Sequence, residues 1–164
     1  AGSAGAWSRK GWLTLTPGAV TDYAYIEKQI LADMETFDLQ TIGYDPWNAT
    51  QVSNDLQAAG FDVDRLTPVR QGAKTLSPVL KEMQRLLTGT QAHPLLRHHG
   101  NPVLRWNVDN LAVKEDVNQN VQPDKADSRD KIDGVAALCN AMSEAMTRPK
   151  PKETSIYETE GLFA

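Results

Sequence analysis

Residues 39–66, "LQTIGYDPWNATQVSNDLQAAGFDVDRL", decide the fold class that the sequence predicts. The segment 39–44 has the composition of a short strand. A capping-box pattern begins at Asn48, and it predicts a helix that ends near Gly60. Residues 61–66 alternate between apolar and charged side chains, which predicts a second strand with one solvated face. A strand–helix–strand unit favours parallel pairing, and therefore an α/β fold.

The rest of the chain continues this alternation of strands and helices. Cap residues and apolar side chains at helical spacing predict four further helices, and β-favouring stretches predict three further strands. The predicted helices begin at Thr21 or Asp22, at Ser77–Pro78, at Asn101–Pro102 and near Ser128, the last running to about Met146. The predicted strands are 11–16 and a pair within 111–126 around an "NQN" turn.

The composition limits the class of protein. A chain of 164 residues that is 40% hydrophobic and 23% charged predicts one globular domain. No apolar run approaches the roughly 18 residues of a membrane helix, so no membrane association is expected. The single cysteine, Cys139, cannot form an internal disulfide, which fits a reducing compartment. The net charge of −4 lacks the basic excess of many nucleic-acid-binding proteins, although local basic groups can still bind phosphate.

Two acids stand where chemistry could occur. Asp45 follows a predicted strand, and sites in open α/β sheets lie outside the carboxyl ends of strands. Asp133 lies in the first turn of the last helix, before Gly134, which permits close backbone approach. Carboxylates without a cysteine cluster suit Mg²⁺ or Mn²⁺, and two such ions can promote phosphodiester hydrolysis. From spacing alone, a turn residue at Asp45 and a helix-dipole partner at Asp133 are the commoner roles.

Other motifs do not support a different chemistry. The adjacent His98 and His99 lack the spaced partners of a zinc site. The stretch "GAKTLS" at 72–77 lacks the spacing of a phosphate loop. Cys139 lies on the apolar stripe of the last helix, and no nucleophile elbow occurs.

Four motifs in a fixed order are more specific than any single residue. They are "YDPWNA" (44–49), "RQG" followed by "LS" (70–77), "HGNPVLRW" (99–106) and "KIDG" (131–134). In this order they resemble the nuclease half of the large terminase subunit of tailed bacteriophages, from about residue 11 to residue 146. The resemblance implies a ribonuclease-H-like mixed sheet flanked by helices. It also implies an endonuclease that uses Mg²⁺ or Mn²⁺ to cut concatemeric double-stranded DNA during genome packaging in the host cell cytoplasm.

The resemblance assigns roles to individual residues. Asp45 matches the second of three metal-binding acids of the family, and Asp133 matches the third. Lys125 precedes the last helix, where many relatives have a basic residue, and is a candidate phosphate contact. Further candidate DNA contacts are Arg70, Lys74, His99 and Arg105.

The chain departs from the family pattern at its beginning. The family's first acid lies on a strand upstream of the region that matches residues 11–16, and nothing here resembles that strand. The sheet is therefore expected to lack its first strand and the metal site its first acid; Asp22 reads better as a helix cap than as a substitute. The expected division is a leader or remnant (1–10), the nuclease domain (11–146) and a flexible tail (147–164).

Two other functions stay open at this level. The chain could be a catalytically incomplete DNA-docking and assembly module of the packaging motor, whose partners by resemblance are the terminase ATPase domain, the small terminase subunit and the portal. It could also be an unrelated α/β enzyme acting on a small molecule, which only the alternation of elements supports.

Overall fold

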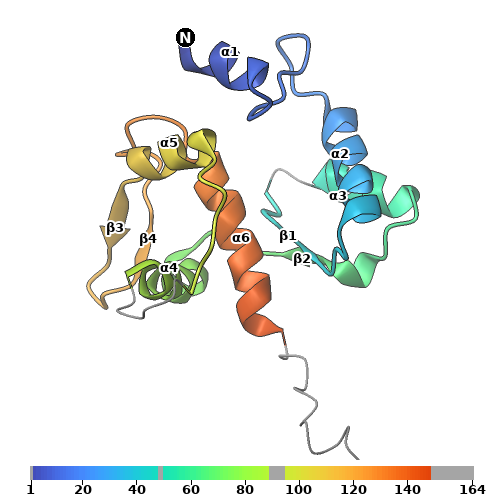
Figure 1. Cartoon of the computed structure of the whole chain (residues 1–164). Coiled ribbons are helices and arrows are strands. Elements are labelled where there is room, and N and C mark those ends of the chain that lie inside the picture. The colour runs from blue at the N-terminus through green and yellow to red at the C-terminus, as the bar shows by residue number, and fades with distance from the viewer. Residues whose placement is uncertain (1, 48–49, 89–94, 149–164) are drawn as a thin grey trace, which may run out of the picture.

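A computed structural model of the chain describes residues 2–47, 50–88 and 95–148 (Figure 1). Within these residues, helices flank two separate two-stranded sheets. The helices are α1 (Gly2–Arg9), α2 (Tyr23–Thr36), α3 (Thr50–Ala58), α4 (Ala73–Thr88), α5 (Pro102–Asn110) and α6 (Asp133–Thr147). The strands are β1 (Ile42–Tyr44), β2 (Leu66–Pro68), β3 (Val113–Glu115) and β4 (Val121–Pro123). None of the described helices is both long and apolar enough to cross a lipid bilayer.

The strand–helix–strand prediction for residues 39–66 is confirmed in its topology. β1 and β2 pair in parallel, with Ile42 opposite Leu66, and α3 connects them. The second strand begins later than the alternation predicts, because the Asp62 carboxylate accepts a hydrogen bond from the Asp64 backbone N–H. That contact closes a 3₁₀ turn at Val63–Arg65 before β2 begins. The predicted cap Asn48 lies outside the described residues.

The predicted hairpin within residues 111–126 is confirmed. β3 and β4 pair antiparallel, with Lys114 opposite Gln122. The residue with positive φ in the "NQN" turn is Gln119, at 62°. The carboxylate of Asp116 stabilises this turn by accepting hydrogen bonds from the backbone N–H groups of Asn118 and Asn120.

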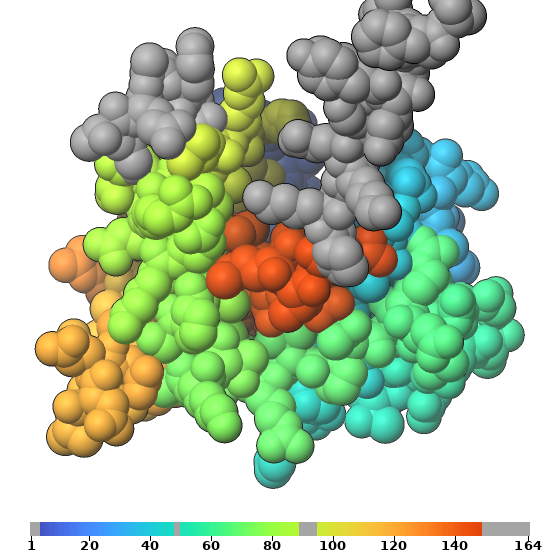
Figure 2. Space-filling model, turned by 90° about the horizontal axis from the view of Figure 1, so that it is seen from below, coloured from blue at the N-terminus to red at the C-terminus, as the bar shows by residue number. Residues whose placement is uncertain are grey.

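α6 is the central element of the molecule. It contacts β1, α4 and α5, and Figure 1 shows it between the β1–β2 sheet and the group formed by α4, α5, β3 and β4. Seen from below, α6 occupies the middle of the face, between α4 and the α3 region (Figure 2). Its apolar stripe contributes Val135 and Cys139 to the main core. The segment from β2 to α4 contributes the other members, Val69, Leu76, Val79 and Met83.

The predicted strand at 11–16 is wrong. Residues 11–16 form no strand, and most of them are exposed, including Leu15 at 57%. They follow α1, whose last turn is closed by a hydrogen bond from the Trp12 N–H to the Trp7 carbonyl. The Trp7 ring packs at 5.6 Å from that of Trp106 on α5. No strand precedes β1 among the described residues, and the expectation of a missing first strand stays a prediction. The division at residues 10 and 146 stays a prediction.

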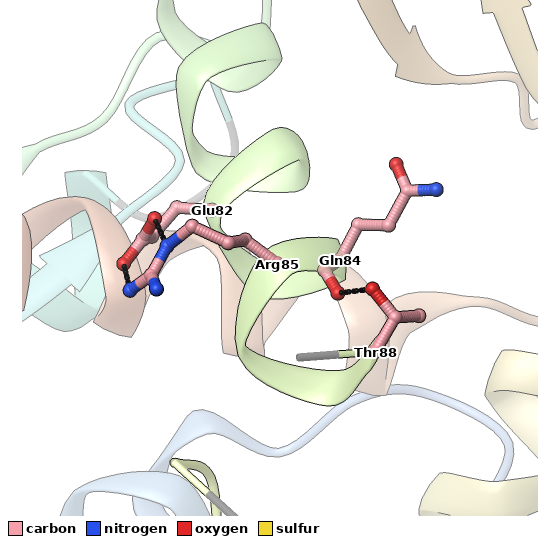
Figure 3. A network of polar contacts seen from close by, with 4 residues as sticks. All are labelled: Glu82, Gln84, Arg85 and Thr88. Carbon is pink, nitrogen blue, oxygen red and sulfur yellow. Dashed lines mark hydrogen bonds and ion pairs between the residues drawn. The ribbon is translucent and has the colours of Figure 1, made fainter. Parts of the chain in front are cut away.

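α4 begins four residues before the predicted cap at Ser77. Ser77 and Pro78 are inside the helix, and Ser77 is 2% exposed. Its hydroxyl oxygen accepts a hydrogen bond from the Val121 N–H, which ties α4 to β4. Figure 3 shows the opposite end of α4, where Arg85 makes a bidentate ion pair with Glu82 and the Thr88 hydroxyl donates to the Gln84 carbonyl.

Candidate active site

The direction of β1 relative to α6 follows from a close contact at Gly43. A Cβ atom on Gly43 would lie 2.7 Å from the Asn140 carbonyl oxygen, so β1 and α6 touch backbone to backbone. Two residues later, Asp45 lines a surface depression that Ala136 of α6 also lines. Two strand residues advance by about 6.6 Å and four helix residues by about 6 Å, so these contacts fit an antiparallel arrangement of β1 and α6.

This arrangement brings Asp45 and Asp133 to the same end of the β1–α6 contact. One face of α6 carries Asp133, Ala136 and Asn140, because these residues are spaced three and four positions apart. Asp133 lies one turn beyond Ala136 in the direction in which β1 points. The two acids that the sequence singled out therefore both lie toward the N-terminal end of α6.

Asp45 is held by the turn that follows β1. Its Oδ1 accepts a hydrogen bond of 3.0 Å from the Trp47 N–H, and the proline between them restricts the backbone. The residue is half-buried, with one side toward α6. A carboxylate in this position has a defined orientation and remains accessible from solvent.

Asp133 is placed by a cap that comes from another helix. Ile132, which precedes α6, makes no side-chain capping bond. Instead, the buried Asn107 of α5 accepts a 2.7 Å hydrogen bond from the Gly134 N–H through its Oδ1. A Cβ on Gly134 would lie 3.1 Å from that oxygen, so the glycine permits the cap. Asn107 and Gly134 together fix the first turn of α6, from which Asp133 projects into solvent.

Lys125 lies beside Asp133 and on the depression that Asp45 also lines. Its Nζ is 3.8 Å from Asp133 Oδ1, and it lines the same depression as Asp45. Both members of the ion pair are largely exposed, so solvent and salt screen their attraction. The pair places a mobile cation beside Asp133.

A third acid at this end was not singled out by the sequence. Asp124 follows β4, is 9% exposed, and lines the depression that Asp45 and Lys125 share, which we name the Asp45–Asp124 depression. Its volume is about 400 Å³. The Ala126 N–H lowers the pKa of Asp124; burial opposes this shift, and the charge of Lys114, whose Nζ is 3.6 Å away, adds to it. The sequence signal that could have identified Asp124 is an acid directly after a predicted strand, the same signal that identified Asp45.

Gln71 and Asn140 are a second pair that sequence reasoning missed. The side-chain amide of Gln71 donates to the Val69 carbonyl and to Oδ1 of the buried Asn140. Gln71 also lines the Asp45–Asp124 depression. The loop before α4 is therefore anchored to the same part of α6 that touches Gly43.

The candidate DNA contacts divide into two groups. Arg70 is exposed and lines a second depression with Asp45, Pro46, Trp47 and Gln71, which we name the Trp47–Arg70 depression. Lys74, His99 and Arg105 are exposed but line neither of these depressions. Arg70 thus lines a depression with Asp45, and Lys125 lies beside Asp133, whereas the other three line neither depression.

The donor set fits a hard divalent cation only in part. Asp45 and Asp133 provide carboxylate oxygens, which Mg²⁺ and Mn²⁺ prefer. Among residues 2–47, 50–88 and 95–148, however, no three acidic, histidine or cysteine side chains lie close enough together to hold an ion. Burial raises the pKa of the Cys139 thiol, and a neutral buried thiol is a poor ligand and a poor nucleophile.

The arrangement is that of a mixed α/β nuclease domain of the ribonuclease-H-like class. The chain matches the family described as "Terminase large subunit, endonuclease domain" over residues 3–148. It therefore belongs to that family. A similar solved structure is the crystal structure of the HK97 bacteriophage large terminase, with a TM-score of 0.76 and 29% identity, covering 85% of this chain and 28% of that chain.

Two sequence relatives extend the comparison. The large terminase subunit of Enterobacteria phage HK97 is 30% identical over 139 residues, which are 85% of this chain and 27% of that protein. Protein YmfN of Escherichia coli strain K12 is 33% identical over 149 residues, 88% of this chain and 30% of that protein. The chain spans less than a third of the length of either relative, and the match identifies the nuclease portion.

Proposed function

We propose that this chain is the metal-dependent endonuclease module of a phage DNA-packaging terminase, which cuts concatemeric double-stranded DNA. The observation that carries the proposal is the contact between β1 and α6. It supports a pairing of Asp45 with Asp133 toward the N-terminal end of α6, where Lys125 lies within 4 Å of Asp133. The remaining partners in this proposal are the terminase ATPase domain, the small terminase subunit and the portal, in the cytoplasm of the host cell.

In this proposal Asp45 and Asp133 hold Mg²⁺ or Mn²⁺, together with a further acid that the described residues do not supply. Bound ions would activate a water molecule and stabilise the leaving oxygen. The chain's own contribution is position and charge. The Trp47 N–H orients Asp45, and Asn107 fixes the turn that carries Asp133. The Lys125 ammonium lies where it can neutralise a phosphate oxygen beside Asp133.

Nicking of supercoiled plasmid in Mn²⁺ tests the proposal. The protein used is this chain extended upstream by the strand that carries the first family acid. We expect Asp45→Asn and Asp133→Asn each to slow nicking by about 100-fold or more, because a lost metal ligand removes several kcal/mol of charge stabilisation. Asp38→Asn makes the same change of charge at an exposed position before β1 and should cut at the parent rate. Equal rates for Asp133→Asn and Asp38→Asn would contradict the assignment of Asp133.

Metal binding has a second readout that does not depend on cleavage. Acids held close together repel one another, so an ion that binds only the folded state raises the melting temperature. We expect Mn²⁺ to raise the melting temperature of the extended chain, and Asp45→Ala to abolish that rise. A rise of equal size in Asp45→Ala would place the ion elsewhere.

A catalytically incomplete DNA-docking and assembly module is the second candidate. It is favoured by the absence of a group of three metal-binding side chains among the described residues, and by the lysines beside Asp124 and Asp133. Such a module should bind DNA with a steep dependence on salt, and binding should persist in EDTA. Complete loss of DNA binding in EDTA would count against it. Membership of the terminase family leaves the small-molecule enzyme without support.

A further inference from the structure

Trp47 is the most exposed tryptophan, tyrosine or phenylalanine among the described residues, at 86%. Tryptophan side chains usually bury most of their area, since an indole exposes a large apolar surface to water. The other described tryptophans, Trp7, Trp12 and Trp106, are exposed by 40% or less. An indole that is solvated beside a candidate catalytic acid therefore needs an explanation.

The Trp47 indole projects from the turn after β1, whose backbone is held by a hydrogen bond to Asp45. The Trp47 N–H donates to Asp45 Oδ1, and Pro46 restricts the backbone between the two residues. The bond that orients the carboxylate thus also fixes the point from which the indole leaves the chain. A group that reaches Asp45 from solvent therefore comes close to the indole.

A cation lines the same depression as Trp47. The exposed Arg70 lines the Trp47–Arg70 depression, which has a volume of about 450 Å³. The depression shares Asp45 and Gln71 with the Asp45–Asp124 depression, so the two adjoin at the candidate acid. A guanidinium suits phosphate oxygens, and an aromatic face suits the face of a base. The chain's net charge of −4 makes such local contacts necessary for DNA binding.

We propose that Trp47 stacks on an unpaired base next to the phosphate at Asp45, while Arg70 contacts the backbone of the same strand. The proposal rests on the proposed function, because that function places a phosphate at Asp45. A paired base in a duplex shows only its edges, and its faces are covered by neighbouring bases. An indole stacks most readily where a base has already left the helix. The preferred DNA at this site is a duplex with a frayed, mismatched or flipped base beside the cut.

Anisotropy binding in EDTA tests this without cleavage. The probes are a labelled duplex of about 30 base pairs and the same duplex with a central mismatch bubble, each long enough for one domain. We expect the chain to bind the bubble more tightly, and Trp47→Ala to reduce that preference about tenfold, because stacking on one base contributes a factor of roughly 5 to 150. Trp47→Phe keeps an aromatic face and should retain most of the preference. Trp12→Ala is the matched control, since Trp12 is partly exposed and lines neither depression.

Arg70 gives an independent readout. Arg70→Ala should weaken binding to both probes by a similar factor and reduce the slope of log affinity against log salt by about 1. Because Trp47 and Arg70 are exposed, both variants should melt at the parent temperature.

The outcomes separate this inference from the proposed function. A bubble preference that Trp47→Ala removes supports stacking, whether or not the extended chain cuts DNA. An absent preference, or one unchanged in Trp47→Ala, overturns stacking even if the nicking assay succeeds.

Discussion

Replacing Gly43 by alanine tests the contact on which the site depends. The new Cβ would lie 2.7 Å from the Asn140 carbonyl oxygen, whereas ordinary van der Waals contact begins near 3.4 Å. β1 and α6 must separate by about 0.7 Å, because the two nearest atoms, the carbonyl oxygen and carbon of Asn140, belong to the backbone and cannot rotate away. Overpacking of this kind costs about 1–3 kcal/mol. For a chain of this size, that corresponds to a fall in melting temperature of about 2–12 °C.

Thermal melting and urea denaturation, followed by tryptophan fluorescence, measure this cost. Gly72→Ala is the matched control, because a Cβ on Gly72 meets nothing within 4 Å and its φ is not positive. That control should stay within about 0.5 kcal/mol of the parent. In the extended, cleavage-competent chain, Gly43→Ala should also slow nicking, since displacement of β1 moves Asp45 relative to Asp133. Equal stability of Gly43→Ala and Gly72→Ala would refute the close contact and the antiparallel arrangement inferred from it.

Three further perturbations probe the supports of the site. Asn107→Ala removes the cap of α6 and should destabilise the fold by about 1–2 kcal/mol in urea titrations; an unchanged midpoint would mean that water replaces the cap. Ser77→Ala leaves the Val121 N–H without its acceptor and should cost about 1–3 kcal/mol by the same measurement, whereas a neutral result would indicate that β4 moves to restore a bond. The hydrogen bond from the Ala126 N–H lowers the pKa of Asp124 in the folded state. The ionised Asp124 carboxylate therefore stabilises the fold at pH values above the ordinary aspartate pKa near 3.8. This stabilisation is lost as the pH falls through the lower pKa of the folded state. Melting temperatures measured below about pH 4 should therefore fall more steeply for the parent than for Asp124→Asn, and parallel curves would contradict this.

The helix boundaries show where local sequence signals suffice. Asn101 followed by Pro102 predicts the start of α5, and Asn101 does accept hydrogen bonds from the backbone N–H groups of Val103 and Leu104. Ser77 followed by Pro78 has the same form but lies inside α4. There, burial of Leu76 and Ser77 against α6 and β4 outweighs the backbone bond that the proline cannot make. A cap signal is decisive only where tertiary packing does not compete with it.

The strands follow the same rule. The alternation at 61–66 predicts a strand, yet Val63 is 55% exposed because the Asp62 side chain closes a turn over it. Residues 11–16 have β-favouring composition but no adjacent strand among the described residues with which to pair. A strand is stable only with a partner for its backbone groups, and the partner is not encoded in the local pattern.

The candidate site was predictable in its members but not in its arrangement. Asp45, Asp133 and Lys125 could be selected from the sequence, the last through a resemblance. The placement of Asp45 and Asp133 toward the same end of α6 depends on the direction of β1 relative to α6. The contact between Gly43 and Asn140 indicates that direction. Asp124 was missed because its role depends on burial and on Lys114 from the neighbouring strand.

The two readings of Asp45, a turn residue and a metal ligand, do not exclude one another. The turn uses one lone pair of Oδ1, and an ionised carboxylate has about four acceptor sites. A carboxylate that already accepts a backbone N–H is fixed in orientation, and such fixation is what metal ligands commonly receive from neighbouring groups. The same hydrogen bond positions Trp47, so the turn couples the candidate ligand to the candidate base-stacking residue. Loss of that bond should therefore disturb metal binding and the preference for unpaired bases together.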